Sequence, residues 1–427
     1  MPNCLCPLKN AVRDAPNLIA ILGKGFSLTF SELDQAADTY RAELQRIGLA
    51  AGHRIVTYHP TDWRLIAFFF AVWRLGASIC PLNLRLPPLQ ISDSLSRLSP
   101  ALYLTDLSLP FQPLRPIPSS SFSSLFLFTS GTTGIPKIAV HSLNSLLTNA
   151  SSAVSGLDLQ PNDQWLLSLP LFHVGGIGTL LRCILARATL VLDERSPQIT
   201  HLSYVPSQLY RAWPTYRNLR CLLLGGAPIH AFPSCLPLYA TYGLTEMGSI
   251  VTVGRKPNSM HLLSGREIKI AEDGEILVRG PCLFQGYWEQ DRIHLPIDEQ
   301  GWFATKDIGR FCPKEGFAIL GRKDWQFISG GENIQPEEIE LELLRLPEII
   351  DAAVIALPDA EFGQRPAAVI QTRFSNYTLH QMQSALKPRL PKFKIPIALF
   401  IFDEIPKNGL KTDRKKIFEL VTRELLN

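Results

Sequence analysis

The chain has 427 residues, 46% of them hydrophobic and 19% charged, and its 42 basic and 38 acidic residues leave a net charge of +4. This is the balance of a globular protein with a large core. The charge is too small to indicate a nucleic acid or a membrane surface as partner, and the length predicts roughly two to four domains.

The first hundred residues alternate between predicted helices and strands. A helix is expected from Ser31 to Gly48, because Ser31 and Asp34 resemble a capping box and a glycine ends the apolar pattern. A strand at 54–58, a helix at 63–75, a strand at 77–80 and a helix at 90–98 follow. This alternation predicts an α/β fold, in which a largely parallel sheet carries helices on its faces.

A polar loop follows a Pro- and Ser-rich linker at 107–124 and a short apolar strand at 125–128. It consists of Thr129, Ser130, Gly131, Thr132, Thr133 and Gly134, and Lys137 comes shortly after it. Hydroxyls, glycine backbone and one cation suit a polyphosphate, although the flanking Pro136 and Ile138 rule out a Walker A motif. On composition alone, a polyphosphate cradle and an ordinary polar turn are equal alternatives.

Further strands between residues 129 and 246 also end in polar or glycine-rich loops. The run from Trp165 leads to His173 and a Gly-rich turn. The run from Cys221 leads to Gly225, Gly226 and Ala227, and the run from Ala240 leads through Tyr242 and Gly243 to Thr245 and Glu246. The carboxyl ends of parallel strands share one edge of a sheet, so we expect these loops to form one pocket. A lone histidine is more often structural, but this position favours a role for His173 in the pocket.

From about residue 255 the strands are short and separated by Gly and Asp-Gly turns, which predicts a small antiparallel or β-barrel-like subdomain. Asp307 lies in its apolar stretch 301–309. A turn carboxylate and a carboxylate that holds ribose hydroxyls are the two alternatives for this residue.

The last hundred residues predict a separate small α+β domain. A polar break at 321–324 precedes a flexible loop at Gly330 and Gly331, and Pro336 opens a helix with acids in its first turn. Strands at 352–357, 367–371 and 397–402, a helix at 379–386 and a basic tail at 407–416 complete it. We place the domain boundary between residues 1–322 and 323–427.

The eight cysteines are scattered, and only Cys4 and Cys6 lie close together, which predicts reduced thiols and no zinc site. The richest apolar run, Leu65 to Leu75, is too short to cross a bilayer, and residues 1–17 lack an apolar signal core. We therefore expect a cytoplasmic protein without a membrane span.

Taken together, these motifs resemble the acyl-adenylate-forming superfamily of acyl-CoA synthetases and adenylation domains. Within it, the stretches 204–209, 327–339, 361–366 and 407–414 are most similar to 2-succinylbenzoate–CoA ligases. The resemblance implies a large N-terminal domain of parallel β/α sheets with a small β-barrel-like subdomain, and a small mobile α+β C-terminal domain. It covers nearly the whole chain through eight motifs in the family's order: FTSGTTGIPK (128–137), LPLFHVGG (169–176), LLGGAP (223–228), YGLTE (242–246), GEILVRGPCLFQGYW (274–288), GWFATKDIG (301–309), GRKD (321–324) and GLKTDR (409–414).

The resemblance also implies residue roles. Lys411 would bridge the acyl carboxylate and the α-phosphate, His173 would lie beside the acyl pocket, and Glu246 would hold Mg²⁺. Asp307 and Arg322 would hold the ribose, and Asp324 would be the hinge. The remaining nucleotide-binding residues would be Thr129 to Gly134 and Lys137 at the β- and γ-phosphates, Gly225, Gly226, Ala227 and Tyr242 around adenine, and Gly243 and Thr245 next to them.

The implied activity is an AMP-forming ligase that joins an acid to coenzyme A with ATP and Mg²⁺, most similar to the enzymes that act on 2-succinylbenzoate in menaquinone biosynthesis. An aryl or fatty acyl-CoA synthetase, and an adenylating enzyme that loads a carrier-protein thiol, are alternatives. A non-catalytic nucleotide-binding relative is disfavoured because Lys137, Glu246, Asp307 and Lys411 are retained. The oligomeric state is left open.

Some positions depart from the family's pattern. Leu410 precedes Lys411 where relatives have glycine, so Lys407 and Lys415 are alternatives for the bridging lysine. Asn333 replaces a frequent arginine, and Trp325 replaces a frequent acid after the hinge. For the second carboxylate of the acid, the candidates are Arg182, Ser207 and His230.

Overall fold

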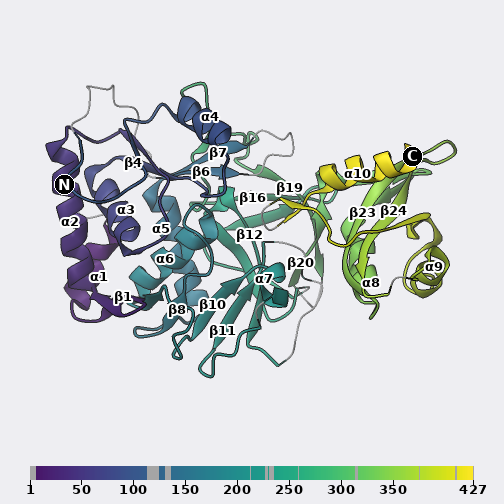
Figure 1. Ribbon diagram of the computed structural model, residues 1–427, viewed down its shortest axis with the longest axis horizontal. Coiled ribbons are helices and arrows are strands. Elements are labelled where there is room, and N and C mark those ends of the chain that lie inside the picture. Colours follow the sequence, from purple (N-terminus) through teal and green to yellow (C-terminus); the bar gives the residue numbers. More distant parts are fainter. Residues whose placement is uncertain are drawn as a thin grey trace.

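The protein was analysed as a computed structural model that describes residues 6–112, 125–129, 136–211, 213–226, 229, 235–257, 259–312, 316–374, 376–408 and 411–426. Figure 1 shows an elongated molecule with a large body that carries the N-terminus and a smaller body that carries the C-terminus. The large body contains two extended sheets and a smaller antiparallel one.

The first large sheet has nine strands. Its neighbours from β12 to β1 pair in parallel, whereas β13, β14 and β2 are antiparallel additions at the edges. In spatial order the strands are β14 (His261–Leu262), β13 (Ser249–Gly254), β12 (Leu238–Leu244), β11 (Cys221–Leu224), β10 (His201–Tyr204), β8 (Gln164–Leu166), β9 (Thr189–Val191), β1 (Ile19–Gly23) and β2 (Phe26–Thr29).

The second large sheet has seven strands, parallel on one side and antiparallel on the other. In spatial order they are β18 (Arg292–His294), β17 (Gly286–Glu289), β7 (Lys137–His141), β6 (Leu125–Thr129), β4 (Ser78–Pro81), β3 (Arg54–Thr57) and β5 (Leu102–Leu104). The predicted parallel α/β architecture is therefore confirmed.

Helices join the two sheets through one apolar core. Buried side chains of α2, α3, α5 and α6 cluster with residues of β1, β8 and β9 in the first sheet and of β3, β4 and β6 in the second (Figure 1). Residues 65–73 of α3 are all buried, as expected of a helix that is apolar on every side. The helices of this body are α1 (Pro7–Asp14), α2 (Phe30–Arg46), α3 (Trp63–Leu75), α4 (Pro88–Leu98), α5 (Leu143–Gly156), α6 (Val174–Ala186) and α7 (Pro206–Arg211).

The capping box of α2 lies two residues earlier than predicted. Thr29 is the N-cap, and the Glu32 carboxylate accepts from the Thr29 backbone N–H at 2.7 Å. The prediction of Ser31 and Asp34 was wrong because Asp34 is committed elsewhere: its carboxylate is paired with Lys9 at 2.7 Å and with Arg74.

The small subdomain of short antiparallel strands is a four-stranded sheet of the large body. In spatial order its strands are β15 (Glu267–Ile270), β16 (Glu275–Arg279), β19 (Phe303–Cys312) and β20 (Gly316–Arg322). Asp307 of β19 lies opposite Arg322 of β20. Phe303 and Phe317 of this sheet share a buried cluster with residues of β12 and β17, so all three sheets meet there.

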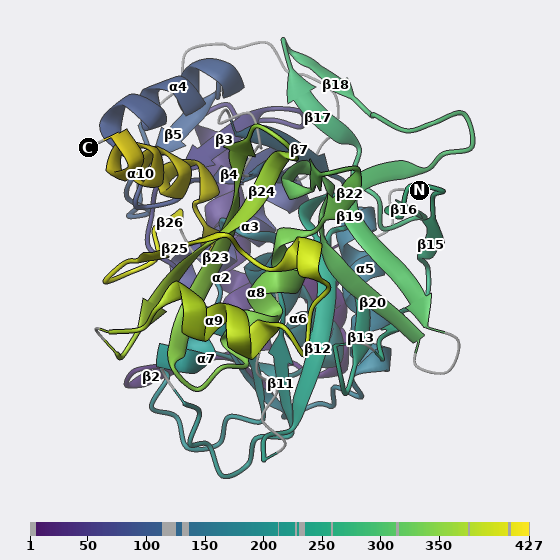
Figure 2. The same cartoon turned by 90° about the vertical axis from the view of Figure 1, so that its right-hand side faces the viewer.

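The C-terminal body is a sheet covered on both faces, and Figure 2 views the molecule from this side. One apolar cluster joins the sheet to α8 and α9, and another joins it to α10. The strands are β22 (Glu332–Ile334), β21 (Phe327–Ser329), β24 (Gly363–Thr372), β23 (Ile349–Asp359) and β25 (Ala398–Ile401), with a separate pair β26 (Lys407–Asn408) and β27 (Lys411–Thr412). The helices are α8 (Pro336–Leu344), α9 (Leu379–Leu386) and α10 (Arg414–Leu426), and no helix of the described residues is long and apolar enough to cross a membrane.

Candidate active site

The predicted phosphate loop joins two antiparallel strands. β6 ends at Thr129 and β7 begins at Lys137, and these two residues are paired in register. The expectation that this loop lies at the same parallel edge as the other strand ends was therefore wrong, because β6 belongs to the second sheet and β8, β10, β11 and β12 belong to the first. The loop residues Ser130, Gly131, Thr132, Thr133 and Gly134 lie outside the described part of the chain.

Lys137 meets an aromatic ring that comes from β17. Tyr287 pairs with Ala139, and Lys137 is two residues before Ala139 on the same face of β7. Lys137 is thus the diagonal neighbour of Tyr287, and its Nζ lies 4.5 Å from the centre of the tyrosine ring. The lysine itself is exposed, so a phosphate could replace the ring as its partner.

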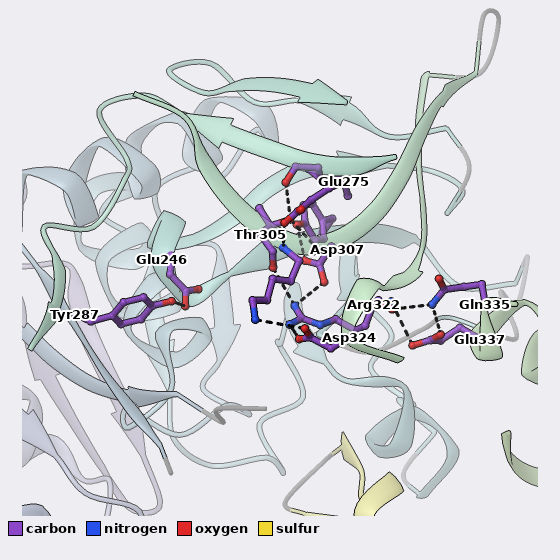
Figure 3. A network of polar contacts seen from close by, with 12 residues as sticks. Glu246, Glu275, Tyr287, Thr305, Asp307, Arg322, Asp324, Gln335 and Glu337 are labelled. Atoms are coloured by element: carbon purple, nitrogen blue, oxygen red, sulfur yellow. Dashed lines mark hydrogen bonds and ion pairs between the residues drawn. The ribbon is translucent and has the colours of Figure 1, made fainter. Parts of the chain in front are cut away.

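The same tyrosine reaches the predicted metal carboxylate. The Tyr287 hydroxyl donates to Glu246 Oε1 at 2.6 Å, as Figure 3 shows. Glu246 lies in a 3₁₀ turn, Thr245–Met247, which follows β12, and its carbonyl accepts from the Phe284 N–H at 2.7 Å. Tyr287 therefore contacts both Lys137 of the second sheet and Glu246 in the turn that follows β12 of the first sheet, which the separate motifs did not reveal.

A buried amide holds the turn that carries Glu246. Asn149 of α5 is fully buried, and its Nδ2 donates to the carbonyls of Met247 at 2.7 Å and Ile250 at 3.0 Å. Because a bent segment leaves backbone carbonyls without partners, this side chain supplies donors that the strands do not. Sequence inspection missed Asn149, which lies in an ordinary helical pattern.

The glycines predicted to frame adenine lie at the carboxyl end of β11. A Cβ atom on Gly225 would come within 2.2 Å of Thr241 Oγ1, and Gly226 has a φ of +78°. Both positions therefore require glycine. Gly243 is in β12, where an added Cβ atom would come within 2.2 Å of the Ser249 carbonyl oxygen. Ala227 lies outside the described residues.

The predicted ribose carboxylate is fixed by two donors. The Tyr242 hydroxyl donates to one oxygen of Asp307 at 2.7 Å, and Arg322 donates to the other at 2.8 Å. Burial, together with the charge of Asp307, raises the pKa of Tyr242 well above its usual value, so the phenol stays protonated and stays a donor. Asp307 is therefore a buried carboxylate held in a strand rather than a free turn carboxylate, and its role at the ribose stays a prediction.

Arg322 also contacts the predicted hinge. Its guanidinium lies 3.0 Å from Asp324, and Lys306 lies 3.4 Å from the other oxygen of the same carboxylate. Burial by itself lowers the pKa of Arg322, but the carboxylates of Asp307 and Asp324 raise it above its usual value. Figure 3 shows this cluster beside the Glu246–Tyr287 pair.

A second set of contacts links this cluster to the C-terminal body. Gln335 donates to the Arg322 carbonyl at 3.0 Å and to Glu337 at 2.6 Å (Figure 3). Arg414 donates to both oxygens of Glu340 and lies 3.6 Å from Glu337, and its guanidinium is 5.5 Å from the Trp325 ring. The segment next to Lys411 is therefore anchored at the start of α8.

Lys411 lies in β27, paired with Asn408 across a two-stranded hairpin, and its side chain lies outside the described part of the structure. Of the two alternatives, Lys407 is bound to Asp351 at 2.7 Å and Lys415 is an exposed residue of α10. Lys407 already has a carboxylate partner within its own domain, which favours Lys411 as the mobile cation.

His173 differs from its predicted setting. β8 ends at Leu166, and His173 is the N-cap residue of α6. The glycines after it form the first turn of the helix rather than a loop. A Cβ on Gly176 would come within 2.3 Å of the Pro170 carbonyl, which explains the glycine there.

Arg182, one of three candidates for the second carboxylate, is buried with 1% of its surface exposed. Its Nη2 donates to Ser249 Oγ at 2.9 Å, and its guanidinium lies 5.5 Å from the Trp165 ring. Among the described residues it has no acidic partner, and burial lowers its pKa to about 10. The His230 position and the Ser207 side chain lie outside the described residues.

The described part of the site contains two buried or half-buried carboxylates, Asp307 and Glu246, each held by a tyrosine hydroxyl. Two family descriptions match the chain: "AMP-binding enzyme" over residues 8–125 and 112–288, and "AMP-binding enzyme C-terminal domain" over residues 338–411. The chain belongs to the AMP-binding enzyme family.

The similar proteins named below share one activity, which is more specific than the family description. The chain is 32% identical over 433 residues to 2-succinylbenzoate–CoA ligase of Haemophilus influenzae, covering 95% of each chain. It is also similar to o-succinylbenzoate CoA synthetase from Bacillus subtilis. The complex of that enzyme with the acyl-adenylate intermediate OSB-AMP matches with a TM-score of 0.84 and 26% identity over 96% of this chain and 97% of that one. The complex of that enzyme with ATP and magnesium ion matches with a TM-score of 0.82 and 26% identity over 94% and 97%.

Proposed function

We propose that this chain is an ATP-dependent, AMP-forming acid–CoA ligase that converts 2-succinylbenzoate to 2-succinylbenzoyl-CoA in menaquinone biosynthesis. The observation that carries the proposal is the held carboxylate Asp307, fixed by Tyr242 and Arg322 beside the Glu246–Tyr287 pair. The similarity to 2-succinylbenzoate–CoA ligases over nearly the full length supports the choice of acid. Its substrates are the acid, ATP and CoA, and we keep the cytoplasm as its expected location.

The reaction has two steps. A carboxylate oxygen of the acid attacks the α-phosphorus of ATP, which forms the acyl-adenylate and releases pyrophosphate. The thiol of CoA then attacks the acyl carbon and releases AMP. Negative charge develops on phosphate oxygens in the first step, so cations held in place before the reaction lower its barrier. Lys137, at the end of the phosphate loop, is assigned to the leaving pyrophosphate.

Glu246 is assigned to Mg²⁺. Glu246 is half-buried, and among the described residues its carboxylate is bonded to the Tyr287 hydroxyl and not to a Lys or Arg. Mg²⁺ in nucleotide sites is held by one or two carboxylates together with phosphate oxygens, so a single carboxylate with one oxygen free of Tyr287 fits. When bound, the ion neutralises the developing charge on the phosphates.

Asp307 is assigned to the ribose hydroxyls. Tyr242 and Arg322 occupy one position on each carboxylate oxygen, and each oxygen has a further lone pair free to accept from a hydroxyl. The two donors hold the carboxylate in place, which orients the sugar and hence the α-phosphate. Gly225 and Gly226 give adenine close access to the backbone.

Arg182 is assigned to the carboxylate of the acid that does not react. A buried guanidinium without an acidic partner carries a large desolvation penalty, which a substrate carboxylate would offset. An Arg182→Gln variant should therefore raise the KM for 2-succinylbenzoate much more than that for a monocarboxylic analogue without this second group.

Lys411 is assigned to the acyl carboxylate and the α-phosphate, and the residues from 323 onward are assigned to a domain that turns about Asp324. Asp324 lies in a short 3₁₀ turn between β20 and β21, so few backbone hydrogen bonds restrain it. The contacts of Arg322 and Lys306 with Asp324 link this turn to β19 and β20.

The purified protein should be incubated with ATP, Mg²⁺, CoA and 2-succinylbenzoate, and the release of AMP and the thioester measured. We expect one AMP for each thioester. Turnover with aryl or fatty acids but not with 2-succinylbenzoate would overturn the assignment of the acid substrate, while the assignment to AMP-forming acid–CoA ligases would stand. The absence of AMP with every acid would support a non-catalytic relative.

A further inference from the structure

Tyr287 makes two different contacts with residues far from it in the chain. Its hydroxyl donates to Glu246 at 2.6 Å, and its ring lies 4.5 Å from the Lys137 ammonium. Only 6% of its surface is exposed, and the ring packs edge-on against Phe284 at 4.8 Å between ring centres. Tyr287 lies in strand β17 and its ring is packed in an apolar cluster, so the side chain has little freedom to change rotamer.

A tyrosine has both a hydroxyl and an aromatic ring, whereas serine has only the hydroxyl and phenylalanine only the ring. The hydroxyl supplies a charge-assisted hydrogen bond to a carboxylate, and the π-face attracts a cation. The hydroxyl occupies one oxygen of Glu246 and leaves the other for a metal ion.

We propose that Tyr287 is the positioning residue that sets the metal carboxylate Glu246 and the phosphate-clamp lysine Lys137 relative to one another. The proposal rests on the function proposed above. The hydroxyl fixes the orientation of Glu246 before Mg²⁺ arrives, and the ring holds the Lys137 ammonium until the polyphosphate of ATP replaces it. Tyr287 itself touches neither the metal nor the reacting atoms.

The strand pairing explains why this role falls to Tyr287. Tyr287 and Ala139 are partners in register, so β17 fixes the ring beside Lys137. The Phe284 N–H, three residues earlier, donates to the carbonyl of Glu246, so the same segment also fixes the turn that holds this carboxylate. Residues 284–287 thus connect the two parts of the nucleotide site through backbone as well as side-chain contacts.

The test removes one oxygen atom. Tyr287→Phe keeps the ring, its packing and the lysine contact but loses the bond to Glu246. We expect the Mg²⁺ concentration for half-maximal pyrophosphate–ATP exchange to rise about tenfold, as the loss of one charge-assisted bond implies. ATP binding measured by calorimetry at low Mg²⁺ should weaken to a similar extent, and exchange at saturating Mg²⁺ should change little.

Tyr242→Phe is the matched control, because it removes the hydroxyl of the other buried tyrosine–carboxylate pair in the same apolar cluster. It should weaken ATP binding at every Mg²⁺ concentration and leave the half-saturating Mg²⁺ concentration unchanged. An unchanged Mg²⁺ dependence in Tyr287→Phe, within twofold of wild type, would overturn the positioning role of the hydroxyl.

The lysine contact has its own test. Tyr287→Leu removes the ring as well, so Lys137→Ala should weaken ATP binding by a different factor in the Tyr287→Leu background than in wild type, measured as a double-mutant cycle. Strict additivity would overturn the ring's role. If wild type showed no exchange with any acid, the proposed function would fail, and calorimetry with ATP and Mg²⁺ would still decide the role of Tyr287.

Discussion

At the scale of single residues, the charged groups of the proposed site are held by hydrogen bonds within the protein. Asp307 is held by Tyr242 and Arg322, and Glu246 is held by Tyr287. Lys407 is bound to Asp351, which favours Lys411 over Lys407 as the lysine proposed to reach the reacting carboxylate. Preorganised groups of this kind act without reorganising during the reaction.

Lys411→Ala should lose roughly 10²- to 10³-fold in pyrophosphate–ATP exchange, because a cation at the reacting oxygens is removed, while ATP binding is retained. Lys407→Ala is the matched control and should keep exchange near the wild-type rate. Loss of exchange in Lys407→Ala together with its persistence in Lys411→Ala would show that the assignment of the lysine is wrong.

His141 makes stability depend on pH. It is fully buried in β7, and burial lowers its pKa to about 4. The unfolded histidine titrates near pH 6.5, so the unfolded state binds more protons between pH 6.5 and 4 and stability falls as the pH falls through this window.

Between pH 7 and pH 5, the wild type should therefore lose about 2 kcal/mol more unfolding free energy than His141→Gln. Urea unfolding at the two pH values measures this difference, and His380→Gln, at an exposed position in α9, is the control. An equal loss of unfolding free energy between pH 7 and pH 5 in wild type and His141→Gln would contradict the prediction.

At the scale of elements, the hairpin β6–β7 is held from outside by α4. The Arg97 guanidinium, at the end of α4, donates to the Pro136 carbonyl at 2.7 Å and lies 5.6 Å from the Phe128 ring. Trp288 donates from its indole to the Arg97 carbonyl at 3.1 Å, so α4, β6 and β17 meet at the base of the phosphate loop.

Arg97→Ala should raise the KM for ATP about fivefold, because the loss of one hydrogen bond, worth about 1 kcal/mol, loosens the residue before Lys137. Arg64→Ala removes an arginine that lies over Trp63 on α3 and should leave this KM unchanged. Steady-state exchange kinetics over a range of ATP concentrations distinguish the two variants. An unchanged KM in Arg97→Ala would mean that α4 does not position the loop.

The elements also show how far sequence inspection reaches. The pair of Asp307 and Arg322 was predictable, because the two residues lie on neighbouring strands of one short hairpin. The contact of Tyr287 with Glu246 was not predictable. β17 follows β16 of the four-stranded sheet in the chain but pairs with β7 of the second large sheet, and no local sequence pattern encodes this pairing. The position of β6 in the second sheet was missed for the same reason.

At the scale of the whole molecule, a large body carries the residues proposed to bind the nucleotide, and a smaller body (Figure 1) contains β27 with Lys411. Asp324 lies between them, in contact with Arg322 and Lys306. The proposed two-step reaction requires one arrangement of the bodies to deliver Lys411 and another to admit the thiol.

Asp324→Pro should slow one half-reaction at least tenfold and leave the other nearly unchanged, because proline fixes the backbone φ angle at the hinge. Asp324→Ala removes the same ion pairs without this restriction and is the control. Exchange reports the first half-reaction, and the transfer of a preformed adenylate to CoA reports the second. If both half-reactions were unaffected by proline, the hinge would lie elsewhere.

The measurement that tests the central claim most directly follows oxygen through the reaction. 2-Succinylbenzoate labelled with ¹⁸O in its carboxylates is incubated with the protein, ATP, Mg²⁺ and CoA, and the products are analysed by mass spectrometry. An acyl-adenylate route leaves one labelled oxygen on the phosphate of AMP and forms 2-succinylbenzoyl-CoA. Thioester formation with unlabelled AMP, or no thioester from this acid, would contradict the account.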